Sequence, residues 1–275
     1  MLYGGYANLM SRVKDIRLKV IPSKIANDFV KKHHYSGTFS NTSRLHFGCF
    51  LDKVLHGVMS FGSPMDKAKI LPIVKNTMWN EMLELNRMVF DEVLPKYSES
   101  RCISIAIKLI KKQAPHIKWI ISFADGTQCG DGTIYRASGF ALTGIKKSTQ
   151  IIKTPRGEII TRMTLTQVGD AKRNRVLREL NIKDTGASSI KQFLTAGCEN
   201  VNGHQLRYIY FLHPEERKNL TVPEIPFSKI KELGASMYLG KKCDVGVKRS
   251  TTSIQDVGGG AIPTTSLHLE RQYAY

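Results

Sequence analysis

Two side chains near the middle of the sequence have the types and the setting that proton transfer requires. Asp125 ends a largely apolar run, residues 118–124, and Tyr135 begins a Tyr-x-x-x-Gly-Phe pattern that ends at Phe140. A carboxylate can accept a proton, and a phenol can donate one to a leaving group. The structural alternatives are that Asp125 is a turn residue before Gly126 and that Tyr135 is a packed ring. We predict catalytic roles for both residues.

A second group of candidates lies near the ends of predicted elements. We expect these polar residues to bind substrate: His33, His34, Tyr35, Ser36 and Arg87. Interaction of an imidazole with the dipole at a helix C-terminus is the structural alternative, and it accounts for one of the two histidines. Arg87 follows Leu83 and Leu85 at strand alternation, which predicts that the three share a face where an unpaired charge would be costly.

The stretch PKYSESRC, residues 95–102, precedes a strongly amphipathic segment that we predict to be a helix. Ser98 is a candidate N-cap, and Ser100 and Arg101 are candidate catalytic residues. A positive charge in the first helical turn opposes the helix dipole. We therefore expect Arg101 to bind an anion, such as a phosphate of a donor molecule or of a nucleic acid.

The charge balance favours a polyanionic partner. The 275 residues include 41 Lys+Arg against 23 Asp+Glu, a formal net charge of +18, and each neutralised phosphate releases counterions. A solvated basic surface is the alternative. We predict a nucleic acid as the partner, contacted in part by Arg175 and Arg178 of a basic helix at residues 171–180.

The cysteines and the apolar runs bear on the compartment. Five cysteines are scattered without a Cys-x-x-Cys pair, which argues against a structural zinc site and for reduced thiols. The first residues lack the apolar core of a signal peptide, and no apolar run is long enough to span a membrane. These features predict a cytoplasmic protein.

Hydrophobic periodicity predicts strands alternating with helices over the first half of the chain. The predicted elements are a strand at 17–21, a helix from 22 to Gly37, a hairpin turning at 52–53, a strand at 82–90, a helix at 99–113, a strand at 117–125 and a helix at 133–139. This order predicts an α+β fold in which helices flank a mixed central sheet.

The pattern changes after Gly144. A second hairpin across residues 155–157, the basic helix and a shorter helix at 188–197 precede a strand-like run, Arg207 to His213. We therefore predict a core of residues 16–145 completed by a strand at 205–213, and a basic insertion at 146–204. A C-terminal extension at 214–275 is expected to be partly irregular, because its Gly, Pro and hydroxyl residues cannot build a core.

The element order resembles the GNAT acyltransferase fold. In that superfamily a strand with an acidic residue, here Glu84, precedes a helix that faces the donor, and a later helix carries Tyr-x-x-x-Gly-Phe, matched by Tyr135, Gly139 and Phe140. GNAT acetyltransferases also carry a glycine-rich loop whose amides hold the pyrophosphate of coenzyme A. Residues 95–102 contain no glycine, which argues against acetyl-CoA as the donor.

Four ordered blocks narrow the resemblance to the phage Mom family. These blocks are KKHHYSGTF, WNEMLELNRMVFDEVLPKYSESR, WIISFADGTQCGDGTIYRASGF and LRYIYFL. The resemblance implies double-stranded DNA as the partner and conversion of its adenine to the carbamoylmethyl derivative on the exocyclic amine, which protects the DNA from restriction enzymes. It also implies iron as a possible metal and, for a phage-encoded protein, the host cytoplasm as the location. Neighbouring helical residues such as His33 and His34 point about 100° apart, so the metal site is left unassigned.

The donor and two other functions remain open at this point. Glycyl-tRNA or another activated glycyl group is a chemically suitable donor for an enzyme without a coenzyme A loop. The alternative enzyme is a GNAT N-acetyltransferase that uses acetyl-CoA on a small-molecule or protein amine. A DNA-binding protein on an inactive GNAT scaffold fits the charge, but it leaves Asp125, Tyr135 and residues 33–36 without a role.

Overall fold

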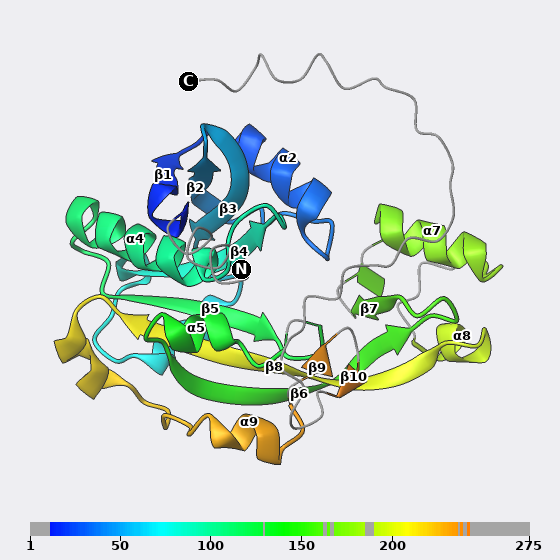
Figure 1. Ribbon diagram of the computed structural model, residues 1–275. Helices are drawn as coiled ribbons and strands as arrows, with labels where there is room; N and C mark the ends of the chain where they lie inside the picture. Colours follow the sequence, from blue (N-terminus) through cyan, green and yellow to red (C-terminus); the bar gives the residue numbers. More distant parts are fainter. Residues whose placement is uncertain are drawn as a thin grey trace, which may run out of the picture. The chain divides into compact units, whose positions relative to one another are not determined.

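The computed structural model describes residues 12–128, 130–161, 164–165, 168–184, 190–235, 237–238 and 241–242 (Figure 1). Within these residues, 12–120 and 211–219 form one compact unit, unit 1, and 121–210 with 220–242 form a second, unit 2. Residues 243–275, predicted to be partly irregular, lie outside the described residues.

Unit 1 is built on antiparallel strands in the order β1-β2-β3-β4. Its elements are η1 (Val13–Asp15), β1 (Arg17–Val20), α2 (Ser23–His33), β2 (Ser43–Leu51), β3 (Val54–Gly62), α3 (Lys67–Ile70), η2 (Leu71–Ile73), η3 (Trp79–Glu81), β4 (Met82–Phe90), α4 (Ser98–Gln113) and η4 (Pro214–Asn219). The predicted hairpin is confirmed: Asp52 and Lys53 connect β2 to β3 with φ values of 51° and 66°. Positive φ at both loop residues is the geometry of a tight two-residue hairpin turn.

Helix α2 packs on β2, β3 and β4 (Figure 1). Ala26 and Val30 on its inner face join Val58 of β3 and Val89 of β4 in one hydrophobic cluster. The helix ends at His33, earlier than the predicted stop at Gly37. The loop that follows, residues 34–38, is bonded to β4, where Nε of Arg87 donates to the carbonyl oxygen of Thr38.

Helix α4 confirms the predicted amphipathic segment, with Ile103, Ala106, Ile107 and Ile110 buried on one face. The prediction that Ser98 caps this helix was wrong. The N-cap is Tyr97, which has a left-handed backbone (φ 74°) and makes no side-chain capping bond. Ser98 is the first helical residue instead, and its buried hydroxyl donates to the carbonyl oxygen of Pro95.

Unit 2 contains strands in the order β5-β8-β6-β7. Its elements are β5 (Trp119–Asp125, which begins in unit 1), α5 (Thr133–Ala137), β6 (Ala141–Lys153), β7 (Ile159–Thr161), α7 (Ala171–Glu179), α8 (Ile190–Thr195), β8 (Glu199–Phe211), α9 (Ser228–Glu232), β9 (Met237–Tyr238) and β10 (Lys241–Lys242). β6 and β8 are antiparallel along their lengths, from Ala141 opposite Ile209 to Lys153 opposite Glu199. β6 continues through Gly144, after which the sequence pattern changes, and β8 begins before residue 205, where the last core strand was predicted to start.

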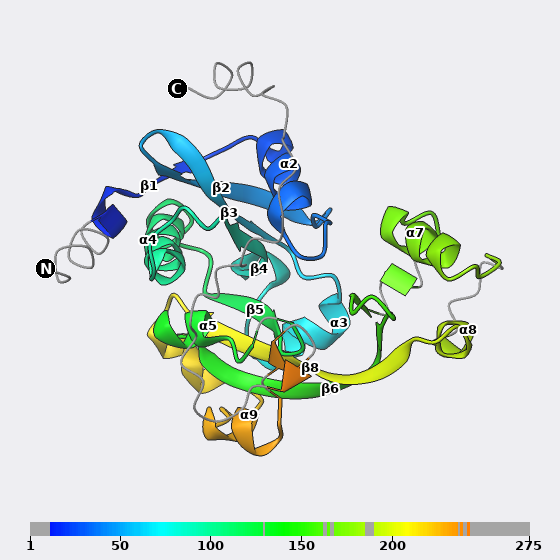
Figure 2. The same cartoon turned by 45° about the vertical axis from the view of Figure 1, so that its right-hand side comes forward.

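A small separate core lies where β6 and β8 reach β7, α7 and α8 (Figure 2). We call this part, residues 149–204, the distal module. Its core contains Ile152 and Ile160 of the hairpin, Val176 and Leu177 of α7, and Phe193 of α8. The basic helix predicted at residues 171–180 is thus amphipathic, with an apolar face that holds it on the strands.

Candidate active site

A β-bulge in β4 gathers polar side chains on the α2 side of the unit 1 sheet. Arg87 lies opposite Ser60 and Leu85 opposite Phe61, so Asn86 is the extra residue between two adjacent residues of β3. Neighbouring residues of a strand face opposite sides, and paired residues share a side. The prediction that Arg87 and Leu85 share a face was therefore wrong, because the bulge reverses the alternation.

The same bulge places Glu84 and Arg87 on one side. Glu84 lies opposite Gly62, two residues from Ser60, the partner of Arg87. Gly62 has no room for a side chain, since an added Cβ would lie 2.7 Å from the Cα of Ser43. We call the group formed by His34, Tyr35, Ser43, Glu84, Asn86 and Arg87 the β4 polar cluster.

Arg87 joins the loop after α2 to β4. Its Nε donates to the carbonyl oxygen of Thr38 at 2.9 Å, and its Nη1 donates to that of Asn86 at 2.7 Å. Burial lowers the pKa of Arg87, and the nearby groups of Tyr35 and Glu84 oppose that shift. The guanidinium thus remains a cation that is only partly exposed, beside the predicted substrate-binding loop.

Glu84 is the one carboxyl of the β4 polar cluster, and its pKa is strongly shifted. Burial raises its pKa to about 7, although a hydrogen bond from Asn86 and the charge of Arg87 lower it. The amide of Asn86 is held from its other end by Ser43, whose hydroxyl donates to Oδ1 at 2.9 Å. A carboxyl that carries its proton near neutral pH, in a polar and partly exposed site, is typical of a functional position.

His34 and Tyr35 lie at the end of α2. The backbone N–H of Ser36 donates to Nδ1 of His34 at 3.2 Å, so that nitrogen is an acceptor and the ring hydrogen of the neutral form lies on Nε2. Burial, followed by the charge of Arg87, lowers the pKa of His34 to about 4. The ring of Tyr35 is 4.3 Å from that of His34 and 47% exposed.

The structure thus brings four of the five predicted substrate-binding residues together and separates the fifth. Ser36 contacts the ring of His34, its hydroxyl lying 2.7 Å from Nδ1. His33 is exposed, and its ring stacks on Phe29 one helical turn earlier.

Ser100 and Arg101, two predicted catalytic residues, lie in the first turn of α4. The hydroxyl of Ser100 donates to the carbonyl oxygen of Tyr97 at 3.2 Å. Nε of Arg101 is buried and has no hydrogen-bond partner among the described residues. The role of Arg101 in binding an anion stays a prediction.

The two predicted proton-transfer residues lie in unit 2. Asp125 ends β5, and its Oδ1 accepts from the backbone N–H of Thr127 at 2.9 Å. Burial raises the pKa of Asp125, against the hydrogen bonds from Thr127 and Gln128. Tyr135 is buried and stacks on Tyr208, with 5.2 Å between ring centroids. Both structural alternatives are thus visible, a turn for Asp125 and ring packing for Tyr135, and neither excludes a catalytic role.

The turn after Asp125 is fixed against β8. Oγ1 of Thr127 accepts from the backbone N–H of His204 at 3.2 Å. Gly126 and Gly203 allow the turn and β8 to approach, since an added Cβ on Gly126 would lie 3.0 Å from the carbonyl oxygen of His204 and one on Gly203 would lie 3.0 Å from Cβ of Thr127. His204 was not among the predicted site residues. Its Nδ1 is buried without a hydrogen-bond partner among the described residues, and burial lowers its pKa.

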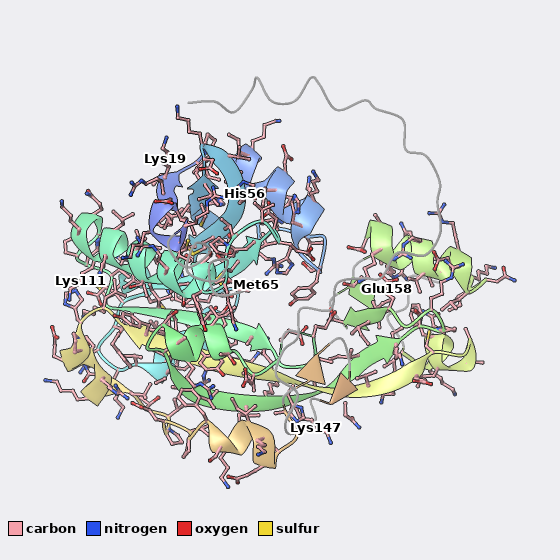
Figure 3. All side chains as sticks on the ribbon, viewed as in Figure 1. Lys19, His56, Met65, Lys111, Lys147 and Glu158 are labelled. Atoms are coloured by element: carbon pink, nitrogen blue, oxygen red, sulfur yellow. The ribbon has the colours of Figure 1, made fainter. Side chains whose placement is uncertain are left out.

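The predicted DNA-binding arginines differ in their environments. Arg175 donates to both carboxylate oxygens of Glu158 at 2.8 and 2.7 Å and to Glu179 at 3.1 Å (Figure 3 labels Glu158 beside α7). These bonds raise the pKa of Arg175 and occupy its guanidinium. Arg178 is exposed, and among the described residues its Nε donates to the carbonyl oxygen of Asn174 at 3.4 Å. Arg178 is thus the better placed of the two for a phosphate.

Neither a metal-binding cluster nor a membrane-spanning helix is found among the described residues. No group of three His, Cys, Asp or Glu side chains in this part of the chain is arranged to hold a metal ion. No helix there is both long and apolar enough to cross a membrane.

The element order defines a GNAT-like α+β fold with a mixed central sheet, as predicted. Similar solved structures include a Bacillus subtilis acetyltransferase in complex with CoA (11% identity, TM-score 0.37, covering 71% of this chain and 98% of that one). Another is spermidine/spermine N-acetyltransferase of Vibrio cholerae (7% identity, TM-score 0.39, covering 75% and 98%). The order of elements, rather than these low scores, supports the fold class.

The family follows from sequence similarity. The model of the Mom protein family matches residues 15–229. The methylcarbamoylase Mom of Escherichia phage Mu is 33% identical over 211 residues, which cover 75% of this chain and 80% of that protein. The chain belongs to the Mom family, and the predicted resemblance is confirmed.

Proposed function

We propose that this protein converts adenine in DNA to its carbamoylmethyl derivative on the exocyclic amine. The observation that carries the proposal is the similarity to a methylcarbamoylase over three quarters of the chain. The net charge of +18 suits a DNA substrate. The β4 polar cluster adds a site with a proton-bearing carboxyl, an arginine and an exposed aromatic ring, which are groups suited to a nucleobase.

We assign proton transfer to Asp125 and Tyr135 and binding of the donor to Arg101. The raised pKa of Asp125 moves this carboxyl toward the range in which a general base works efficiently. The unpartnered Nε of Arg101 suits a donor phosphate. Iron enters no step of this proposal, since the described residues offer no metal-binding group.

The donor is proposed to be an activated glycyl ester such as glycyl-tRNA. In a first step adenine's exocyclic nitrogen attacks the ester carbonyl, the ester C–O bond breaks and the nitrogen loses a proton to a base. The glycyl amine then attacks the ring carbon, and the bond from that carbon to the original nitrogen breaks. The original nitrogen leaves as the amide and regains a proton, which gives a ring–NH–CH2–CO–NH2 product.

The domain division remains part of this proposal. A catalytic core of residues 16–145, completed by 205–213, would carry the chemistry, and the insertion at 146–204 would contact DNA. The exposed position of Arg178 in the distal module supports the second assignment.

The test is nucleoside mass spectrometry of DNA from cells that express the protein, with Asp125→Asn as the matched control. We expect a carbamoylmethyl adduct on deoxyadenosine with the wild type and a strong loss of it with the variant. Unmodified DNA from cells that contain folded wild-type protein would contradict the proposal. An acetyl adduct on an amine would instead support the acetyltransferase alternative.

A further inference from the structure

Several polar side chains of the β4 polar cluster hydrogen-bond to one another. These bonds determine which donor and acceptor positions of Glu84 remain for a ligand. Asn86 accepts from Ser43 with its oxygen and donates to Glu84 with its nitrogen. One acceptor position of Glu84 is therefore occupied by the protein. The remaining acceptor positions and, in the acid form, one O–H donor are available on a side chain that is only half-buried.

That capacity matches one edge of adenine. The Watson–Crick edge of this base presents an acceptor, N1, next to a donor, the exocyclic amine. A carboxylic acid presents an O–H donor next to a carbonyl acceptor, so the two groups form a pair of hydrogen bonds. An ionised carboxylate has acceptors only and would meet the lone pair of N1.

We propose that Glu84, as a neutral carboxylic acid, reads the Watson–Crick edge of the target adenine while Tyr35 stacks on its ring. This inference rests on the proposed function. It makes Glu84 a base-binding residue that contacts N1 and the exocyclic amine of the target adenine from β4. A base that has left the duplex stack is typically recognised in this way, by hydrogen bonds to that edge and by aromatic stacking.

The contacts of Arg87 explain how the two residues are held in one site. Arg87 is bonded to the backbone at Thr38, in the loop that carries Tyr35, and it interacts electrostatically with both Tyr35 and Glu84. The ring of Tyr35 rests against the neutral ring of His34. The stacking residue and the reading residue are therefore linked through a single guanidinium across the end of α2.

The ionisation of the cluster supports the assignment. The pKa of Glu84 is raised to about 7 by burial, and a base placed over it would remove more water and raise that pKa further. The groups on the same side are Arg87 on β4, which stays cationic, and His34 after α2, whose pKa of about 4 keeps it neutral above pH 6. His46 of β2 lies opposite Ser60, the partner of Arg87, and burial lowers the pKa of His46 as well. Of these groups, Glu84 is therefore the one that changes charge between pH 6 and pH 8.5.

The test measures binding to an oligonucleotide duplex whose target adenine faces an abasic site, so that flipping costs little. A second probe carries purine at that position, which keeps N1 but lacks the exocyclic amine, and serves to measure base discrimination. Affinities of wild type, Glu84→Gln, Glu84→Ala and Tyr35→Ala are measured by fluorescence anisotropy from pH 6 to pH 8.5. Glu92→Gln, at an exposed carboxyl just after β4, is the matched control.

For the wild type we expect adenine affinity to fall about tenfold or more across this range, because each pH unit above the pKa removes a factor of ten of the acid form. Glu84→Gln carries a permanent N–H donor and should show no such pH dependence. Glu84→Ala should bind weakly at every pH and discriminate less between the two bases. Tyr35→Ala should weaken both probes alike, and Glu92→Gln should keep the wild-type profile.

A wild-type affinity that does not change with pH, or Glu84→Gln that binds no better than Glu84→Ala, would overturn the inference. Thermal unfolding of each variant separates these outcomes from misfolding. The proposed function fails independently, if the wild type leaves adenine in DNA unmodified. Modification by the wild type together with a flat pH profile would refute the role of Glu84 alone.

Discussion

Substitution of Gly203 by alanine tests whether β8 positions Asp125. An added Cβ would coincide with Oγ1 of Thr127 and would lie 3.0 Å from its Cβ and 2.6 Å from Cδ1 of Ile151. The end of the isoleucine side chain can move, but Thr127 is fully buried in the turn whose N–H bonds to Asp125. Overpacking of this kind costs about 1–3 kcal/mol, so we expect the free energy of unfolding to fall by about that amount.

The effect on activity should exceed the effect on folding. A shift of the turn moves the Asp125 carboxylate, and a displacement near 1 Å can reduce a rate by about 100-fold. We therefore expect Gly203→Ala to retain its fold and lose most of the adenine modification measured by mass spectrometry. Asn202→Ala, at the exposed neighbouring position of β8, should change neither quantity.

A double-mutant cycle isolates the contact. Thr127→Ala alone removes the acceptor of the His204 N–H and should cost about 1–3 kcal/mol. It also removes the atom that the new methyl group would displace. The two substitutions together should therefore cost less than the sum of the single values, by about 0.5 kcal/mol or more in urea unfolding. Additive costs would show that Gly203 and Thr127 do not compete for space and would refute the reasoning.

Three further predictions concern DNA binding, stability and the donor. Arg178→Ala should reduce the slope of log affinity against log salt by about 0.9. Arg175→Ala should leave the slope unchanged, because two carboxylates already bind that guanidinium. A wild-type slope for both variants would remove α7 from the interface. Arg173→Ala should destabilise the protein by roughly 3 kcal/mol in urea unfolding, near the lower end for a broken buried pair. The guanidinium of Arg173 is fully buried and binds Asp184 through two bonds of 2.6 and 2.7 Å, while that carboxylate is 40% exposed. A loss below about 1 kcal/mol would contradict this. With glycine labelled at nitrogen, the label should appear on the ring-attached nitrogen of the product, and a label confined to the amide would exclude the rearrangement.

Much of the fold could be predicted because its signals are local. The alternation of 82–90, the helical spacing from Ile103 to Ile110 and the turn at residues 52–53 each depend on a few neighbouring residues. Side-chain periodicity follows from backbone geometry, so such patterns indicate an element without knowledge of its neighbours. The family blocks were predictable for the same reason, as they are continuous stretches of sequence.

The candidate site was only partly predictable, because its chemistry depends on long-range pairing. The bulge at Asn86 appears in no local pattern, yet it decides that Glu84 and Arg87 share a face. Arg175 was selected as a DNA contact from its helix alone, and its partner Glu158 comes from a separate hairpin. His204 gave no sequence signal, since its burial depends on the turn that packs against β8.

The sequence by itself determined the kinds of groups available to this protein: an excess of positive charge, paired histidines, isolated carboxyls and a tyrosine after a buried strand. The tertiary structure decided which of those groups are ionised and which are already occupied. Glu84 retains a proton near pH 7 because folding removes water from it. Arg175 is bound because folding brings Glu158 to a helix that already carries Glu179. Desolvation and charge pairing act through space between segments distant in sequence, and for that reason only the folded chain specifies them.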